Sequence, residues 1–92
     1  MRSVRILEEA AEEAAEAAVW YEAERPGLGN DFSEAVETAI DLIEQNILPL
    51  LTMSGEAGAQ GAKRIILKRF PYDIVAVERS HKALVIAVAH HS

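Results

Sequence analysis

The sequence predicts a single α+β domain over residues 1–92, with elements in the order β-α-α-β-β-β. After one short alternating segment come two segments with helical periodicity, and three apolar segments typical of strands fill the C-terminal third. Short connections separate most neighbouring segments, which favours antiparallel neighbours. We therefore expect a helix hairpin packed on one face of a small, twisted antiparallel sheet.

The N-terminal part predicts a strand followed by a helix. Residues 3–7 alternate, with Val4 and Ile6 on one side, and residues 8–24 are rich in Ala and Glu, which are good helix formers. Trp20 lies off the apolar stripe of this helix. We favour core packing for Trp20, and the alternative is that it covers the hairpin edge or a partner surface. The expected inner face follows helical spacing and comprises Leu7, Ala11, Ala14, Ala18 and Tyr21.

A second helix is expected after the connection at residues 25–30. Pro26 opposes continuation of the first helix, and the glycines beside it permit a turn with positive φ. Asp31 is predicted to cap the second helix, with Asn30 as the alternative, and Glu34 lies three residues after Asp31 as in a capping box. Pro49 is expected to end it, and the glycine-rich residues 54–61 are expected to form a loop. The apolar stripe of this helix comprises Phe32, Val36, Ala39, Ile40, Ile43 and Ile47.

The C-terminal third predicts a meander of three strands. Residues 63–70 and 73–79 flank an aromatic corner, where Pro71 has no N–H for a central ladder and disfavours a helix before it. Residues 80–82 form a short polar turn, and residues 83–89 are a continuous apolar run, typical of a central strand.

Alternation in the first of these strands predicts two faces, one with Arg64, Ile66, Lys68 and Phe70 and the other with Lys63, Ile65, Leu67 and Arg69. If the helices cover the apolar face, Arg64 and Lys68 line an open sheet surface. Such a surface would suit an RNA phosphate or the acidic tail of a partner protein. The simpler interpretation is that these cations protect a sheet face or edge.

The composition excludes several classes of protein. The formal net charge is -6, from 15 acidic and 9 basic residues, so direct nucleic-acid binding by the whole chain is not expected. The carboxylates concentrate in residues 8–44, which leaves a locally basic sheet beneath an acidic helical layer as one arrangement. The chain has no cysteine, no signal-peptide pattern and no apolar run long enough to span a bilayer. We expect a soluble cytoplasmic protein that does not bind membranes.

No catalytic motif with usable spacing is present. There is no nucleophile elbow, phosphate loop or dinucleotide fingerprint. His90 and His91 are adjacent, so in a strand they point to opposite faces and are poor joint ligands. We therefore expect neither a metal nor a cofactor, while His90 alone stays a candidate base. His81 is expected to lie solvated in a turn.

Several short motifs together resemble the RelE/ParE superfamily, the toxin components of bacterial type II toxin–antitoxin modules, which include plasmid-stabilisation proteins. They run in order over roughly residues 4–90. The matching residues are Trp20-Tyr21, Arg25-Pro26-Gly27-Leu28-Gly29, Phe32, Ile43, Pro49, Arg64, Phe70-Pro71-Tyr72, Ile74 and Val88-Ala89-His90. The resemblance implies a helix hairpin on a twisted antiparallel sheet, and an antitoxin partner whose flexible segment wraps the toxin.

The resemblance leaves two activities open, since one branch cleaves mRNA on the ribosome and the ParE branch poisons DNA gyrase by binding. The candidate catalytic residues for cleavage are Arg64, Lys68 and His90. The position after Tyr72, basic in those nucleases, is Asp73, and residues 1–92 do not include their C-terminal Arg/Tyr segment. These departures favour a ParE-like gyrase inhibitor.

For target or partner binding, the candidates are Arg64, Lys68, Tyr72, Arg79 and Trp20. A ribosome-dependent mRNA endonuclease is the first alternative. A degenerate, non-toxic module that still binds an antitoxin is the second. A homodimer is left open.

Overall fold

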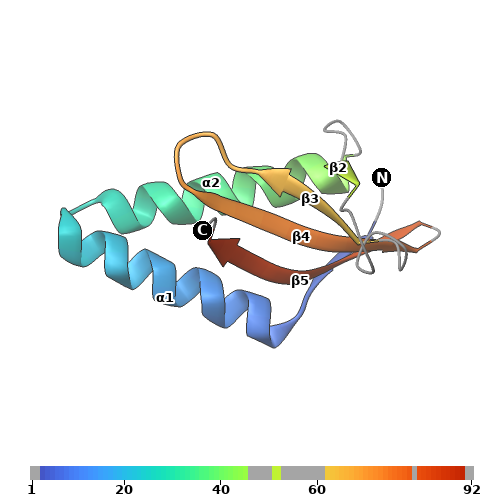
Figure 1. The fold of residues 1–92 in the computed structure, drawn as a ribbon, viewed down its shortest axis with the longest axis horizontal. Coiled ribbons are helices and arrows are strands. Elements are labelled where there is room, and N and C mark those ends of the chain that lie inside the picture. The colour runs from blue at the N-terminus through green and yellow to red at the C-terminus, as the bar shows by residue number, and fades with distance from the viewer. Residues whose placement is uncertain (1–2, 46–50, 53–61, 80, 91–92) are drawn as a thin grey trace.

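The computed structural model describes residues 3–45, 51–52, 62–79 and 81–90, and it confirms the predicted α+β fold (Figure 1). Ile47, Pro49 and the predicted loop at residues 54–61 lie outside the described residues. A short strand at residues 51–52 is additional to the predicted order. The elements are β1 Ser3–Ile6, α1 Glu8–Glu24, α2 Leu28–Glu44, β2 Leu51–Thr52, β3 Ala62–Ile66, β4 Tyr72–Arg79 and β5 Lys82–His90.

The five strands form one sheet in the order β1-β5-β4-β3-β2, with the two helices packed side by side on one face (Figure 1). Strands β3 to β5 pair antiparallel, as predicted, and the additional strand β2 pairs antiparallel with β3. Strand β1 instead pairs parallel with β5, from Ser3 opposite Lys82 to Ile6 opposite Val85, so the sheet is mixed and the prediction of a wholly antiparallel sheet is wrong. A parallel pair needs a long crossover, and the helix hairpin with the meander after it supplies one.

The aromatic corner joins β3 to β4 as a bent hairpin. The Leu67 N–H donates to the Tyr72 carbonyl at 2.9 Å, and the Tyr72 N–H donates to the Phe70 carbonyl at 2.7 Å. Strand β3 ends at Ile66, earlier than predicted. Phe70 therefore does not share the exposed face of Arg64: it turns back at the bend and is buried in the core. Strand alternation applies only while the chain is extended.

Helix α1 has the predicted bounds, and Ala14, Ala18 and Tyr21 of the predicted stripe pack against the core. The most buried positions are Ala10 and Ala17, which were not predicted, whereas Ala11 is exposed. Trp20 is 58% exposed, so our preference for core packing is wrong and this ring lies on the surface. Each helical side chain covers the surface over the turn before it. Alanine covers little of that surface, so a stripe of alanines predicts the buried face of a helix less accurately than a stripe of large side chains does.

The two helices are joined by only three residues, because α2 begins at Leu28. The predicted cap, Asp31, lies inside the first turn of α2, where its N–H donates to the Gly27 carbonyl. The cap comes from α1 instead: the Glu22 carboxylate accepts the Gly27 N–H at 3.0 Å and the Gly29 N–H at 3.1 Å. These amides have no carbonyl partner within their own helix, and the N-terminal end of a helix favours a negative charge.

Both glycines of the connection are required by this geometry. Gly27 has φ +90°, a conformation that side chains disfavour. Gly29 lies against the backbone of α1, and a Cβ built there would be 2.4 Å from the Ala18 carbonyl oxygen. The helices can therefore approach closely only with glycine at this position.

The core lies between α2 and the central strands. The predicted apolar positions of α2 that are described face inward, and β4 and β5 supply the opposite side. The largest fully buried side chains are Phe32, Ile43, Ile74 and Val85.

We expect Gly29→Ala to destabilise the fold by about 1–3 kcal/mol, the usual range for overpacking. Alanine ordinarily stabilises a helix relative to glycine by up to about 1 kcal/mol. A lower stability of Gly29→Ala would therefore be caused by the close approach of this position to Ala18. Urea unfolding followed by circular dichroism measures it. Asn30→Ala, at the exposed neighbouring position, is the control and should change stability by less than about 0.5 kcal/mol. A Gly29→Ala variant as stable as the parent chain would contradict the packing.

We expect Glu22→Ala to lower the free energy of unfolding by about 1 kcal/mol, as for loss of a helix cap. Glu24→Ala removes an equal charge from the same last turn of α1. It should be neutral or slightly stabilising, because a carboxylate is unfavourable at a helix C-terminus. Equal effects of the two substitutions would show that Glu22 does not cap α2.

Candidate functional site

Arg64 lies on the exposed face of β3, but this cation is paired. Ile65 is buried and Arg64 is exposed, as the predicted alternation requires within the strand. Lys68 is also exposed, but it lies in the bend after β3 and lines a hollow with Asp31 and Glu34 of α2, so it does not form a common face with Arg64. The Arg64 Nη1 lies 3.3 Å from the Asp73 Oδ2. Asp73 is 8% exposed and is the only buried charged residue in the described part of the chain. An anion that approaches Arg64 therefore also meets a carboxylate.

Two further cations of β3 and the bend after it, predicted to lie on the face opposite Arg64, are engaged in ion pairs. The Lys63 Nζ lies 2.8 Å from the Glu78 Oε1. The Arg69 Nη2 lies 3.6 Å from the Asp31 Oδ2, and the Arg69 guanidinium carbon is 5.4 Å from the centre of the Phe70 ring. Lys68 has no ion-pair partner among residues 62–79 or elsewhere in the described ranges. Arg79 ends β4, and its side chain lies outside the described part.

The structure places His90 and Arg64 on opposite faces of the sheet. The His90 ring contacts the Tyr72 ring edge-on, with centroids 5.0 Å apart. Tyr72 packs against the core beneath the helices, and the next residue, Asp73, points to the other face, where it meets Arg64. A base at His90 and a cation at Arg64 therefore cannot act on the same phosphate.

An aromatic cluster takes in Tyr72, the predicted binding residue of the corner. Tyr21 of α1 is its centre, with ring centroids at 5.1 Å to Trp20, 5.2 Å to Phe32, 4.9 Å to Phe70 and 6.2 Å to Tyr72. Tyr72 is thus half-buried and holds the fold together. Burial raises the pKa of Tyr21 above its ordinary value, and the nearby Tyr72 phenol raises it further. The sequence contained these rings as separate motifs, and nothing in it showed that they converge.

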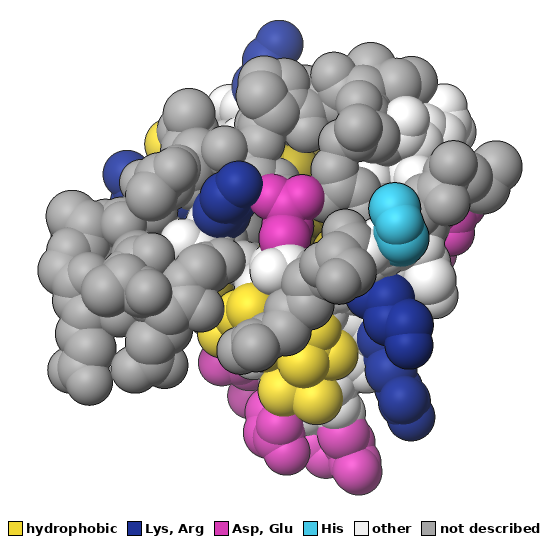
Figure 2. Space-filling view, turned by 90° about the vertical axis from the view of Figure 1, so that its right-hand side faces the viewer, with side chains coloured by type: hydrophobic (Ala, Val, Ile, Leu, Met, Phe, Trp, Pro, Cys, Tyr) yellow, Lys and Arg dark blue, Asp and Glu magenta, His cyan; other side chains and the backbone are white. Residues whose placement is uncertain are grey.

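The surface also carries apolar features open to a partner. Figure 2 shows hydrophobic side chains lying between acidic and basic ones at one end of the molecule. The large exposed hydrophobic residues are Ile6, Val19, Trp20 and Ile66. Trp20 was a predicted partner-binding residue, and its exposure leaves it accessible for that role.

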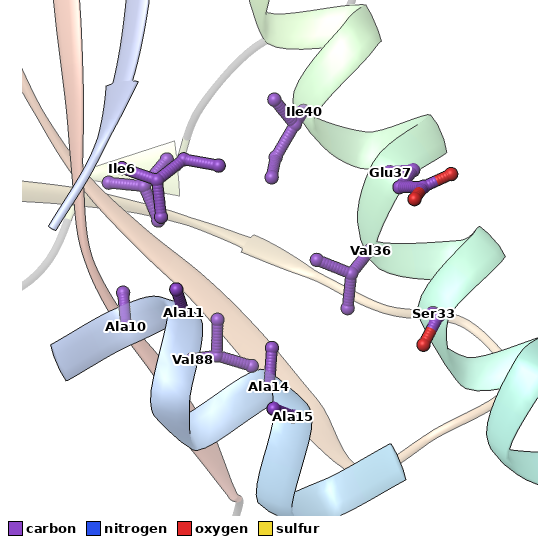
Figure 3. A pocket seen from close by; sticks show the side chains of 11 residues that line it. Ile6, Ala10, Ala11, Ala14, Ala15, Ser33, Val36, Glu37, Ile40 and Val88 are labelled. Carbon is purple, nitrogen blue, oxygen red and sulfur yellow. The ribbon is translucent and has the colours of Figure 1, made fainter. Parts of the chain in front are cut away.

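A cleft of about 230 Å³ lies between α1 and α2, and we call it the helix cleft. Val36 and Ile40 of α2 point across it toward the alanine methyl groups of α1 (Figure 3). The small α1 side chains leave this space unfilled. Its lining comprises Ile6, Ala10, Ala11, Ala14, Ala15, Ser33, Val36, Glu37, Ile40, Val85 and Val88. A predominantly apolar cleft suits apolar side chains of a partner.

Two other features bear on function. Within the described ranges, no group of three or more His, Asp or Glu side chains converges as a metal site would require. No helix in the described part is both long and apolar enough to cross a membrane.

Comparison with known proteins identifies a fold. No protein-family model matches the sequence, and no curated protein matches it. Among solved structures, a chain from the chromosomal ParDE TA system of P. aeruginosa is similar, with a TM-score of 0.83 and 13% sequence identity. The similarity covers 100% of this chain and 98% of that chain. At this identity the match shows the fold alone, and it confirms the predicted RelE/ParE-like architecture.

We expect the Tyr21 phenol to titrate above its ordinary pKa of 10.0, as followed by tyrosinate absorbance. Because the folded state favours the neutral phenol, the stability from this group is fully present below the unfolded pKa of about 10 and is lost as pH rises through the folded pKa. In urea unfolding, Tyr21→Phe should remove the decrease in stability at alkaline pH. In Tyr72→Phe, Tyr21 should still titrate above its ordinary pKa. An ordinary titration of Tyr21 would contradict its burial.

Proposed function

We propose that this chain is the toxin component of a bacterial type II toxin–antitoxin system, acts in the cytoplasm and is neutralised by a cognate antitoxin. The observation that carries the proposal is the similarity of fold over the whole chain to a chain of a ParDE TA system. The motifs that resemble the RelE/ParE superfamily support it independently, because that resemblance rests on residues and not on coordinates.

We further propose that the toxin acts as ParE-like proteins do, by binding its target, with DNA gyrase the target. Pairing of Arg64 with Asp73 supports binding over RNA cleavage, since cleavage needs cations free to stabilise the phosphate. The separation of His90 from Arg64 supports it as well, because general base and cation must reach one phosphate.

The helix cleft is the surface that we assign to the antitoxin. It is almost wholly apolar and opens between the helices, so a partner segment could bury aliphatic side chains in it. Trp20, Lys68 and Arg79 remain our candidates for further contacts with the antitoxin or the target. Arg64 and Tyr72 would contribute indirectly, through the ion pair and the aromatic cluster.

The test is inducible expression with and without the adjacent small reading frame. We expect growth arrest that co-expression relieves, intact transcripts, and loss of plasmid supercoiling. With purified protein, gyrase supercoiling should be abolished at saturation and restored by the antitoxin.

Each alternative gives a different outcome in the same experiment. Cleaved transcripts that become intact in Arg64→Ala would establish the endonuclease. Normal growth with tight binding of the neighbouring gene product would establish a non-toxic module. Growth arrest with supercoiling unaffected at saturating protein would remove the gyrase assignment.

A further inference from the structure

The outer face of α1 carries an exposed aromatic side chain whose position is fixed. Trp20 is 58% exposed and its neighbour Val19 is 71% exposed. The Trp20 ring contacts the Tyr21 ring edge-on at 5.1 Å and 81°, and Tyr21 itself is held in the aromatic cluster. A tryptophan ordered before binding loses little conformational freedom on association, and tryptophan is enriched among residues that dominate binding energy.

Carboxylates flank this ring on the same helix. Glu16 and Glu24 lie four residues before and after Trp20, so all three side chains share one face of α1, and both glutamates are exposed. We call Val19, Trp20, Glu16 and Glu24 the Trp20 surface. It lies on a different side of α1 from the helix cleft, whose lining includes none of these residues.

The charge around the Trp20 surface has a single sign. Seven glutamates lie in α1 and five carboxylates lie in α2, and neither helix contains Lys or Arg. Arg25 is the only cation between Glu8 and Ala62. By contrast, the cations Lys63, Arg64 and Arg69 of the sheet side are paired within the molecule. Arg69 pairs with Asp31 of α2 and Arg25 lies at the connection, so the helical layer keeps a net negative charge that these two cations offset only near the connection.

We propose that the Trp20 surface binds a basic segment of a partner protein, with an arginine or lysine seated over the Trp20 ring between Glu16 and Glu24. A cation within about 6 Å of an indole face is attracted by its quadrupole. Arginine suits the site best, because its planar guanidinium stacks on the ring while its N–H groups donate to carboxylates. Aliphatic side chains beside the cation would cover Val19.

The same charge argues against other occupants. An acidic segment, a nucleic-acid backbone and an anionic membrane would each be repelled by the helical carboxylates. The inference concerns the sign of the partner's charge and does not need the chain to be a toxin. Growth arrest tests the proposed function and direct binding tests this surface, so either can fail alone.

The chain contains one tryptophan, so its fluorescence reports on this surface directly. The probe is a short peptide that alternates leucine and arginine, compared with matched peptides in which citrulline or glutamate replaces arginine. We expect a saturable change in Trp20 emission with the arginine peptide, weakened by added salt, and no change with the other two. Equal responses to the arginine and citrulline peptides would overturn the proposal.

Variants distinguish binding at the Trp20 surface from attraction of the peptide to the net charge of the protein. Because exposed ion pairs each contribute little, we expect roughly tenfold weaker binding in the Glu16→Gln/Glu24→Gln double variant. The control, Glu34→Gln/Asp41→Asn, removes the same charge from exposed positions of α2 outside the helix cleft and should bind within about twofold of the parent chain. Circular dichroism confirms that each variant is folded.

The remaining outcomes would overturn the proposal. Equal weakening in the two double variants would mean attraction to net charge alone. Binding by calorimetry that is unchanged in Trp20→Leu would mean that the ring takes no part. A DNA duplex or an anionic vesicle that alters Trp20 emission more than the arginine peptide does would assign the surface to a different class of partner.

Discussion

The ring of Tyr21 is where both helices and the corner of the sheet meet, and the rest of the structure depends on this contact. It packs on Phe32 of α2 and on Phe70 and Tyr72 of the corner, within 4.9–6.2 Å between centroids. For these rings to meet, α1 and α2 must lie close together near their connection. Gly29 permits that approach, and Glu22 satisfies the amides that the short connection leaves without partners.

Charge separates the molecule into two layers with different chemistry. The helices carry carboxylates without cations, whereas most described cations of β3 and its bend are held in ion pairs. Pairing reduces the field that the sheet face presents to an anion, while the helical layer, apart from Asp31, which pairs with Arg69, keeps its negative charge. An overall charge of -6 therefore understates how acidic the exterior of the helical layer is.

The sequence predicts what depends on periodicity and misses what depends on contacts between distant residues. The bounds of α1 and the buried positions Phe32, Val36 and Ile43 follow from spacing alone. The start of α2 does not, because its cap is a side chain of the preceding helix; Asp31 has the right residue type in the wrong place. The parallel pairing of β1 likewise has no local signal in the sequence, because it depends on which strand lies beside β1 in the fold, and that strand is β5, at the other end of the chain.

In the candidate site, too, the sequence predicts which face a residue lies on but not which residue it contacts. From the sequence, strand alternation predicted that Arg64 lies on the exposed face. The negative charge of Asp73 was the only reason to expect that it disfavours phosphate binding. In the fold the two are partners, so the carboxylate repels an anion and also engages the guanidinium. His90 is similarly engaged with Tyr72 on the other face. Two of the three residues suited to phosphate chemistry, Arg64 and His90, are thus engaged by other side chains on opposite faces of the sheet. The accessible features that remain, above all Trp20 and the helix cleft, are suited to contact with another protein, and they support the binding mechanism proposed above.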